Sequence, residues 1–135
     1  MRRFETIVVA IRRDYDKAYA LLADPRNYPR WSPVPDALFQ PIDNDRRNWL
    51  VDLPRGRRVL KFTPPNDFGV LDYSVYLEDG TYETTSSVRL VPNEDGCVLV
   101  VSFFKRDELS DEEFESEVRW AENDFKAIAS AIEAL

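Results

Sequence analysis

The sequence of 135 residues contains no histidine and only one cysteine, Cys97. Without histidine there is no Ser-His-Asp triad and no zinc site with imidazole ligands. One cysteine cannot form an internal disulfide, and a thiol with no histidine to activate it is expected to be buried and inert. The sequence therefore predicts no metal and no cofactor, and the scarcity of cysteine is typical of a cytoplasmic protein.

Glycine and basic residues are also scarce. The four glycines are far apart, which excludes a glycine-rich phosphate-binding loop. The formal net charge of −7 argues against nucleic acid or an anionic membrane as the main partner, because both bind basic surfaces. The densest basic run is Arg55–Arg58, which we interpret as a solvated turn. No apolar run has the length of a membrane span or the pattern of a signal peptide.

The most informative segment is Ser110–Leu135, whose hydrophobic pattern predicts one long amphipathic helix. Ser110 and Glu113 have the spacing of a capping box at its start. Apolar residues recur at steps of four and three along one face: Phe114, Val118, Ala121, Phe125, Ile128, Ile132 and Leu135. A coiled-coil seam is the alternative, but the short stripe with two phenylalanines favours packing against a domain core.

Two short helices are expected before residue 36. Asp14 or Asp16 can cap the first, and Asp24-Pro25 begins the second, because aspartate caps a helix and proline fits its first position. Trp31 follows, and we interpret it as a core side chain beneath a loop rather than a ligand contact. The second helix is expected to end in an extended segment with Pro29, Pro33 and Pro35.

Strand patterns occupy most of the remaining chain. Phe4–Ile11 is rich in β-branched residues, and we expect Ile7, Val9 and Ile11 to face inward. After residue 36, apolar and polar residues alternate in about six strands joined by short turns, which predicts an antiparallel sheet. A sheet with one apolar face and a helix with one apolar stripe can bury each other. Residues 1–135 are therefore expected to form a single domain.

Asp79-Gly80 is the strongest hairpin signal in the chain. If these two residues form the turn, Leu77 faces Tyr82 and Val75 faces Thr84. The inner face would then carry Leu71, Tyr73, Val75, Leu77, Tyr82, Thr84, Ser86 and Val88. After a four-residue loop, the last strand would place Leu99, Val101 and Phe103 opposite Val88, Ser86 and Thr84.

Three segments carry a family resemblance. Leu21–Trp31 reads LLADPRNYPRW, Asn66–Tyr73 reads NDFGVLDY and Leu109–Phe114 reads LSDEEF. With the order of elements, these segments resemble the SRPBCC superfamily, also called START-like or birch-pollen-allergen-like. Within it they are most similar to a bacterial branch described as polyketide cyclase/dehydrase-like. Tyr73 stands where that branch is expected to have histidine, so no proton-transfer role is carried over to it.

The resemblance implies an α+β helix-grip fold. In this fold a curved antiparallel sheet of about seven strands surrounds the long C-terminal helix, and two short helices follow the first strand. It also implies an apolar cavity between sheet and helix. Members of the superfamily bind lipids, polyketides, steroids or plant hormones, and some catalyse cyclisation or dehydration, so the fold alone does not select a ligand.

The candidate ligand-binding residues are aromatic and hydroxyl side chains that the predicted register turns inward. They are Trp49, Phe62, Tyr73, Tyr82, Thr84, Ser86, Phe103 and Phe125. No catalytic residue is assigned, since acid–base chemistry would fall to Asp, Glu, Tyr, Lys or Arg. Asp72 and Arg89 are expected to form an ion pair on the outer face. Glu117 and Asp124, on the helix flank of Trp120, are expected to be solvated.

The expected function is binding of a small, largely apolar molecule, lipid- or polyketide-like, with or without cyclase- or dehydratase-type chemistry. The alternative is a protein–protein adaptor with an acidic surface and a filled core. A cavity of about 300 Å³ or more between sheet and helix would favour the first. The sequence leaves the oligomeric state open.

Overall fold

Seven antiparallel strands and one long helix form the fold. A computed structural model describes residues 1–31, 38–44 and 47–135, so the segment with Pro33 and Pro35 lies outside the described residues. The elements are β1 Phe4–Ile11, α1 Tyr15–Ala23, the 3-10 turn η1 Pro25–Asn27, α2 Tyr28–Trp31, β2 Phe39–Pro41, β3 Asn48–Leu53, β4 Gly56–Phe62, β5 Tyr73–Tyr76, β6 Tyr82–Asn93, β7 Gly96–Phe104 and α3 Asp111–Glu133. The strand order is β1-β7-β6-β5-β4-β3-β2. The predicted helix-grip fold is confirmed.

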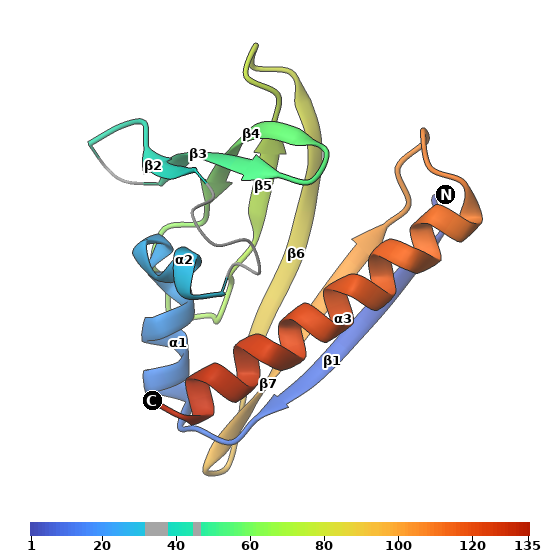
Figure 1. The fold of residues 1–135 in the computed structure, drawn as a ribbon. Helices are drawn as coiled ribbons and strands as arrows, with labels where there is room; N and C mark the ends of the chain where they lie inside the picture. The colour runs from blue at the N-terminus through green and yellow to red at the C-terminus, as the bar shows by residue number, and fades with distance from the viewer. Residues whose placement is uncertain (32–37, 45–46) are drawn as a thin grey trace.

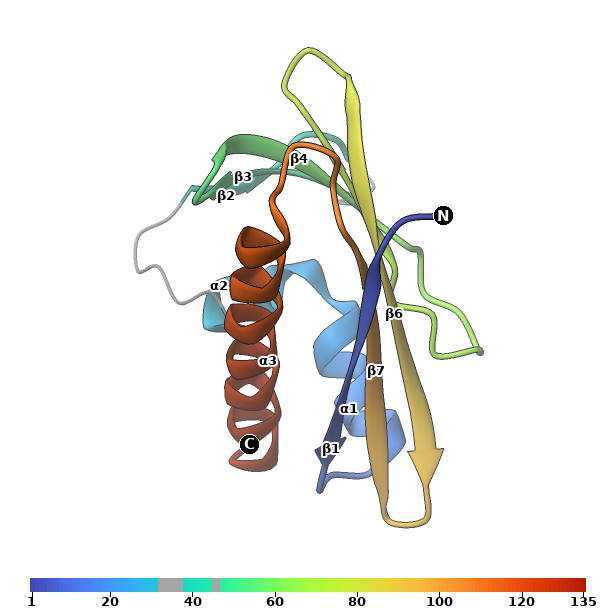
Figure 2. The same cartoon turned by 90° about the vertical axis from the view of Figure 1, so that its right-hand side faces the viewer.

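The sheet curves around one face of α3. Figure 1 shows β6 running along most of the sheet, while β2, β3 and β4 lie across its upper end. Figure 2 shows α3 on one side of β1, β7 and β6, with β3 and β4 turning over toward the helix. The helix therefore packs closely along one edge of the sheet and stands apart from the curled end.

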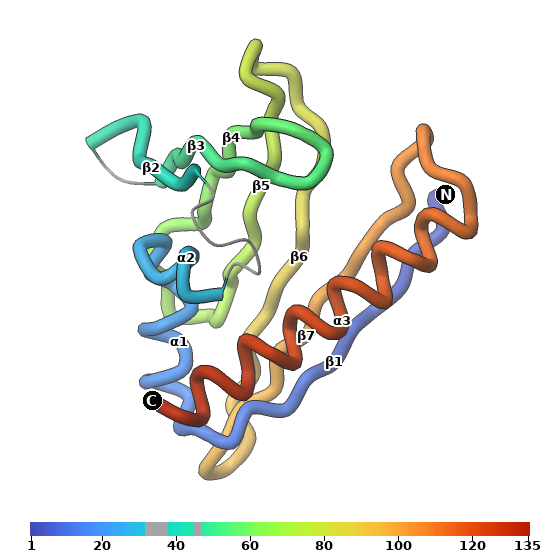
Figure 3. The backbone as a smooth tube through the Cα atoms, in the orientation of Figure 1, coloured from blue at the N-terminus to red at the C-terminus, as the bar shows by residue number. Residues whose placement is uncertain are grey.

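Strand β1 and α3 run side by side in the same direction (Figure 3), so the residues that flank β1 contact both ends of the helix. At the start, the Arg3 guanidinium donates to the Glu115 carboxylate at 3.0 Å. At the end, the Arg13 guanidinium donates to the backbone carbonyl of Leu135 at 2.8 Å. Each contact is exposed and weak alone, but together they align the helix with the strand.

The helix begins at the predicted capping box. The Ser110 hydroxyl accepts from the Glu113 amide at 3.1 Å, and the Glu113 carboxylate accepts from the Ser110 amide at 3.0 Å. The predicted stripe is buried at Phe114, Ala121, Ile128 and Ile132. Leu135 is 49% exposed instead, because the helix ends at Glu133 and the stripe does not continue past its last turn.

The predicted helix caps of the N-terminal half form, but Pro29, expected in the extended segment after the second helix, lies within α2 because proline fits the first turn of a helix. Ile7, Val9 and Ile11 are buried on the inner side of β1. Asp14 is the cap of α1, since its carboxylate accepts from the Lys17 amide at 3.1 Å. Asp24 accepts from the Arg26 amide at 3.0 Å and so begins η1 before Pro25. Cys97 is buried as predicted, and this burial raises the pKa of its thiol.

Two hairpins differ from the predicted register. In the β5–β6 hairpin Val75 faces Thr84 as predicted, but Tyr82 pairs with Tyr76 rather than Leu77 because of a bulge after Val75. The turn also contains one residue more than predicted, since the Leu77 amide bonds the Thr81 carbonyl at 2.8 Å. These shifts move Tyr82 to the outer face, where it is 57% exposed. The prediction that Tyr82 points inward is therefore wrong.

The β6–β7 hairpin has a shorter turn than predicted. Asn93 pairs with Gly96, so the turn is Glu94-Asp95 and the register moves by two residues. Leu99 thus faces Leu90, and Val101 faces Val88. Because side chains alternate with a period of two, this even shift leaves the predicted inner residues on the inner face.

The segment Asn66–Tyr73 is held by local hydrogen bonds. The Asn66 side chain accepts from the Phe68 and Val70 amides at 3.0 and 3.1 Å and donates to the Val70 carbonyl at 2.9 Å. Gly69 adopts a φ of +67° and packs directly against the backbone of Leu90. Asp72 accepts from the Val88 amide at 2.7 Å. Most of this family-like motif therefore shapes the backbone.

Asp72 and Arg89 form the predicted ion pair on the outer face. The side chain of Asp72 is 27% exposed and that of Arg89 is 43% exposed. The pair therefore lies on the side of the sheet that faces away from α3.

Replacing Ser110 with alanine should lower the free energy of unfolding by about 1 kcal/mol, because the Glu113 amide loses its side-chain acceptor. Ser130→Ala is the control, since Ser130 is an exposed residue within the same helix. Urea denaturation followed by circular dichroism measures both. Equal stabilities for the two variants would show that the capping box does not stabilise α3.

Gly69→Ala should cost at least about 2 kcal/mol, because the new methyl group would overlap the Leu90 carbonyl and the backbone would stay left-handed. Gly80→Ala is the matched control. Its φ is +92°, but no atom lies within 4 Å of the position of its added Cβ, so only backbone strain of about 1 kcal/mol is expected. Thermal unfolding of both variants tests the difference, and a Gly69 variant no less stable than the Gly80 variant would refute it.

Candidate functional site

A cavity of about 520 Å³ lies between the inner face of the sheet and α3. Its walls come from β4, β5, β6 and β7 on one side and α3 on the other, and α2 packs against α3 beside it. The cavity exists because the straight helix follows the β1–β7 edge while the rest of the sheet curls away. Six of the eight predicted binding residues line it: Phe62, Tyr73, Thr84, Ser86, Phe103 and Phe125.

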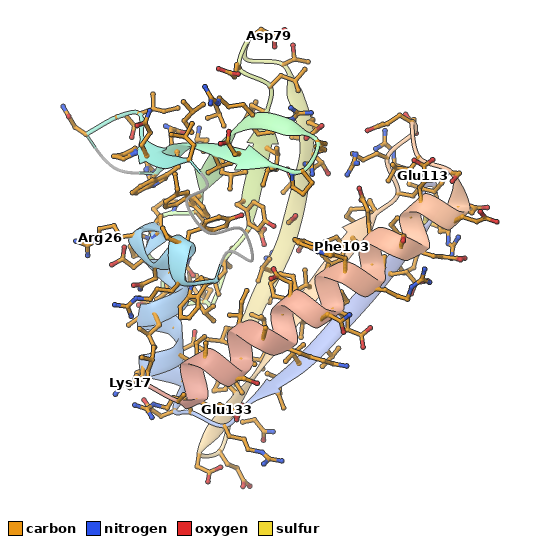
Figure 4. All side chains as sticks on the ribbon, in the orientation of Figure 1. Lys17, Arg26, Asp79, Phe103, Glu113 and Glu133 are labelled. Atoms are coloured by element: carbon orange, nitrogen blue, oxygen red, sulfur yellow. The ribbon has the colours of Figure 1, made fainter. Side chains whose placement is uncertain are left out.

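Two aromatic pairs form opposite parts of the cavity wall. The Phe62 and Tyr73 rings, on the neighbouring strands β4 and β5, have centroids 5.9 Å apart. The Phe103 and Phe125 rings join β7 to α3 with centroids 6.5 Å apart. Figure 4 shows Phe103 beside α3. Such tilted pairs expose ring faces and edges, which suit a flat or branched apolar ligand.

A stack of three rings supports the wall near α2. Phe39 lies between Tyr28, at a centroid distance of 4.7 Å, and Trp49, at 4.3 Å. Tyr28 lines the cavity, whereas Trp49 is 5% exposed and does not line it. The predicted role of Trp49 as cavity wall is therefore wrong, because the short strand β2 brings Phe39 between Trp49 and Tyr28. Trp31 lines the cavity and also packs against the core.

Three hydroxyl groups face the apolar interior. Ser86 is buried, and it faces Tyr73 directly across the β5–β6 strand pair. Desolvation raises the pKa of Tyr73, while the Ser86 side chain acts in the opposite direction. Thr84 lies two residues before Ser86 on the same face. These groups can orient a polar atom of a ligand. Tyr82 does not belong to this set, since it does not line the cavity and its exposed hydroxyl bonds Thr85 at 2.8 Å.

Charged residues of the cavity wall are the part that sequence reasoning missed. Arg55, predicted to be solvated, lines the cavity and donates to the Glu83 carboxylate at 2.8 Å. Arg106 also lines it and donates to the Glu117 carboxylate at 3.0 Å. Each of these cations therefore has an anionic partner, although the cluster of Arg55, Arg58 and Glu83 keeps one positive charge.

Asp124 is the exception, because no hydrogen bond or ion pair of its carboxylate is present among the described residues. It projects from α3 into the cavity wall, beside Phe125. Desolvation raises its pKa. Desolvation is also the main cause of the raised pKa of Tyr28 and of Tyr73, to which the Asp124 charge adds. The expectation that Asp124 is solvated is wrong. The spacing Ala121, Asp124, Ile128 continues the apolar stripe and was the signal that its side chain faces inward.

Within the described ranges, no group of three or more potential ligand side chains is arranged to hold a metal ion. None of the described helices combines the length and hydropathy that a membrane crossing requires. The polar side chains that line the cavity carry hydroxyl, carboxylate and guanidinium groups.

The fold is similar to that of several solved structures. An uncharacterised protein from Bacillus thuringiensis aligns with a TM-score of 0.73 and 18% identity, over 96% of this chain and 98% of that chain. Ara h 8.0201 aligns with a TM-score of 0.69 and 13% identity over 100% of both chains. Norcoclaurine synthase from Thalictrum flavum, solved with dopamine and hydroxybenzaldehyde, aligns with a TM-score of 0.58 and 16% identity, over 76% of this chain and 68% of that chain.

At these identities the likeness shows a shared fold, and it confirms the helix-grip fold that the sequence resemblance implied. No protein-family model and no curated protein matches the sequence. The polyketide cyclase/dehydrase-like branch stays a prediction.

Asp124→Asn should stabilise the protein at pH 8 by about 1 kcal/mol, because it removes an unpaired charge from a partly desolvated position. A carboxyl group whose pKa is raised by folding destabilises the folded state above that pKa. The gain should therefore shrink as the pH falls through the raised pKa and vanish once the carboxyl group is protonated in both states.

Urea denaturation between pH 4 and 8 measures this dependence. Glu122→Gln is the control, because Glu122 is on the same helix and bonds Lys126 at 2.9 Å on the surface. A loss of stability in the Asp124 variant at pH 8 would mean that the carboxylate has a stabilising partner.

Proposed function

We propose that the protein binds a small, largely apolar molecule in the cavity between the sheet and α3. The supporting observation is the cavity of about 520 Å³ with aromatic walls and few polar groups. Ligand sites in proteins have volumes of roughly 300–1,000 Å³ and this composition. A filled interior would favour the adaptor alternative, so the open cavity favours ligand binding.

The apolar walls would supply most of the affinity. Each 100 Å² of apolar ligand surface removed from water contributes roughly 2.5 kcal/mol, whereas one neutral hydrogen bond contributes about 1 kcal/mol. The Tyr73 and Ser86 hydroxyls would therefore orient a ligand more than hold it. The fold neighbour norcoclaurine synthase, solved with two small aromatic molecules, supports a ligand of this size class.

Cyclase- or dehydratase-type chemistry is the finer proposal for the same cavity. Such a reaction needs an acid or base beside the bound molecule, and the residues in position are Tyr73 and Asp124. Desolvation raises the pKa of the Asp124 carboxyl group, which makes it a better candidate for proton exchange than an ordinary surface carboxylate. Turnover of a polyketide-like substrate that is lost in Asp124→Asn, while the substrate still binds, would support this step.

Ser86→Phe should abolish ligand binding, because its ring would fill the space beside Tyr73. Overpacking usually lowers the free energy of unfolding by about 1–3 kcal/mol, and the empty space of the cavity should reduce this cost. Ser87→Phe is the matched control, since Ser87 is the next residue of β6 and points to the outer face opposite Ser102. It should leave binding unchanged.

Fluorescence of the neutral probe N-phenyl-1-naphthylamine measures binding, and a thermal-shift panel of apolar compounds extends it. If wild type binds none of these compounds, or if Ser86→Phe unfolds the protein, the packed-core adaptor replaces the ligand-binding proposal.

A further inference from the structure

The charged side chains of the cavity wall are unequally paired. The described wall contains Arg55, Arg106, Glu117 and Asp124 as its charged residues. Arg55 shares Glu83 with Arg58, at 2.8 and 3.2 Å, and all three side chains are at most 31% exposed. Arg106 is held by Glu108 at 2.7 Å and by Glu117 at 3.0 Å. Each cation therefore has an anionic partner within the protein, whereas Asp124 has none among the described residues.

The surroundings of Asp124 are aromatic. Phe125 is its neighbour on α3, and Tyr28 and Tyr73 line the same cavity. Desolvation raises the pKa of both tyrosines most; the Asp124 charge raises it further, and the charge of Arg55, which is paired with Glu83, lowers it. Ring faces attract cations, and a carboxylate attracts them more strongly in a partly desolvated site than in water. A cationic group placed here would meet both kinds of partner at once.

We propose that the molecule bound in this cavity carries a protonated amine beside its apolar part, and that the Asp124 carboxylate accepts a hydrogen bond from that amine. The inference rests on the proposed binding function and specifies its ligand class: an apolar amine. The rest of the molecule would lie between the Phe62–Tyr73 and Phe103–Phe125 pairs.

Two other ligand classes fit the charges less well. A carboxylate or phosphate ligand would be repelled by Asp124, and Arg55 and Arg106 would have to leave glutamates that already hold them. A neutral hydroxyl could donate to Asp124, but it would leave the carboxylate charge uncompensated, whereas an ammonium group adds the attraction between opposite charges in a partly desolvated site. The protein's net charge of −7 also raises the local concentration of cations rather than anions.

The test uses two probes of nearly equal size and shape. 1-Naphthylmethylamine is protonated at pH 7.5, and 1-naphthalenemethanol is its neutral counterpart. Dissociation constants are obtained by displacement of N-phenyl-1-naphthylamine from the full chain. Wild type should bind the amine about tenfold more tightly than the alcohol, as expected for one hydrogen bond between charged groups.

Asp124→Asn should remove this preference by weakening amine binding about tenfold, while alcohol binding should change much less because the asparagine Oδ1 still accepts from a hydroxyl. Glu122→Gln changes the net charge equally on the same helix, outside the cavity wall, and should keep the preference. This control separates a local contact with Asp124 from a general effect of the acidic surface.

Each remaining outcome is decisive. Equal affinities of wild type for the two probes, or a preference that survives in Asp124→Asn, would overturn the inference. If the alcohol and N-phenyl-1-naphthylamine bind but the amine does not, the cavity binds neutral molecules and the amine inference alone fails. If no probe binds to wild type, the proposed binding function fails, and the amine inference fails with it.

Discussion

The apolar stripe of α3 is the constraint on which the rest of the structure depends. A helix of 23 residues cannot bury this stripe by itself, so the sheet must cover it. Strand β1 aligns with the helix through Arg3 and Arg13, and close packing follows along the β1–β7 edge. The helix is straight and the sheet is curved, so contact along one edge requires separation at the other. The cavity is the space that this separation leaves.

Local rules were sufficient for the elements and insufficient for the register. Caps at Asp14, Asp24 and Ser110 depend only on neighbouring residues, and all three formed as predicted. The register depends on turn length and bulges, which nearby residues specify weakly. The β6–β7 hairpin moved by an even number of residues and kept its inner face, whereas the bulge in the β5–β6 hairpin turned Tyr82 outward. An error of an even number of residues in the register therefore keeps each side chain on its predicted face, whereas a shift of one residue moves it to the other face.

In the candidate site, the residues assigned by strand alternation were mostly predicted, whereas those that depend on other elements or on an assumption about charge were not. The aromatic and hydroxyl residues were predictable because alternation alone assigns a face, and six of eight line the cavity. The position of Trp49 behind the cavity wall was not predictable, because the Phe39 ring that lies between Trp49 and Tyr28 belongs to a different strand, β2. Asp124 was missed because charge was taken to imply solvent, although its helical spacing placed it on the inner stripe. Conversely, Asn66 and Gly69 of the family-like motif serve the backbone.

The position of Asp124 runs against stability. A carboxylate that lines an apolar wall with no described partner gains little from its neighbours and loses hydration, so an asparagine of equal size would suit folding better. In the same region Arg55 and Arg106 are paired with glutamates, which shows that the fold can provide counter-charges where it needs them. A charge left unmatched beside three aromatic rings is therefore best explained by a partner that arrives from outside. An ammonium group compensates the carboxylate on binding. Asp124 therefore lowers the free energy of unfolding of the unliganded protein and makes the cavity selective for a cationic ligand.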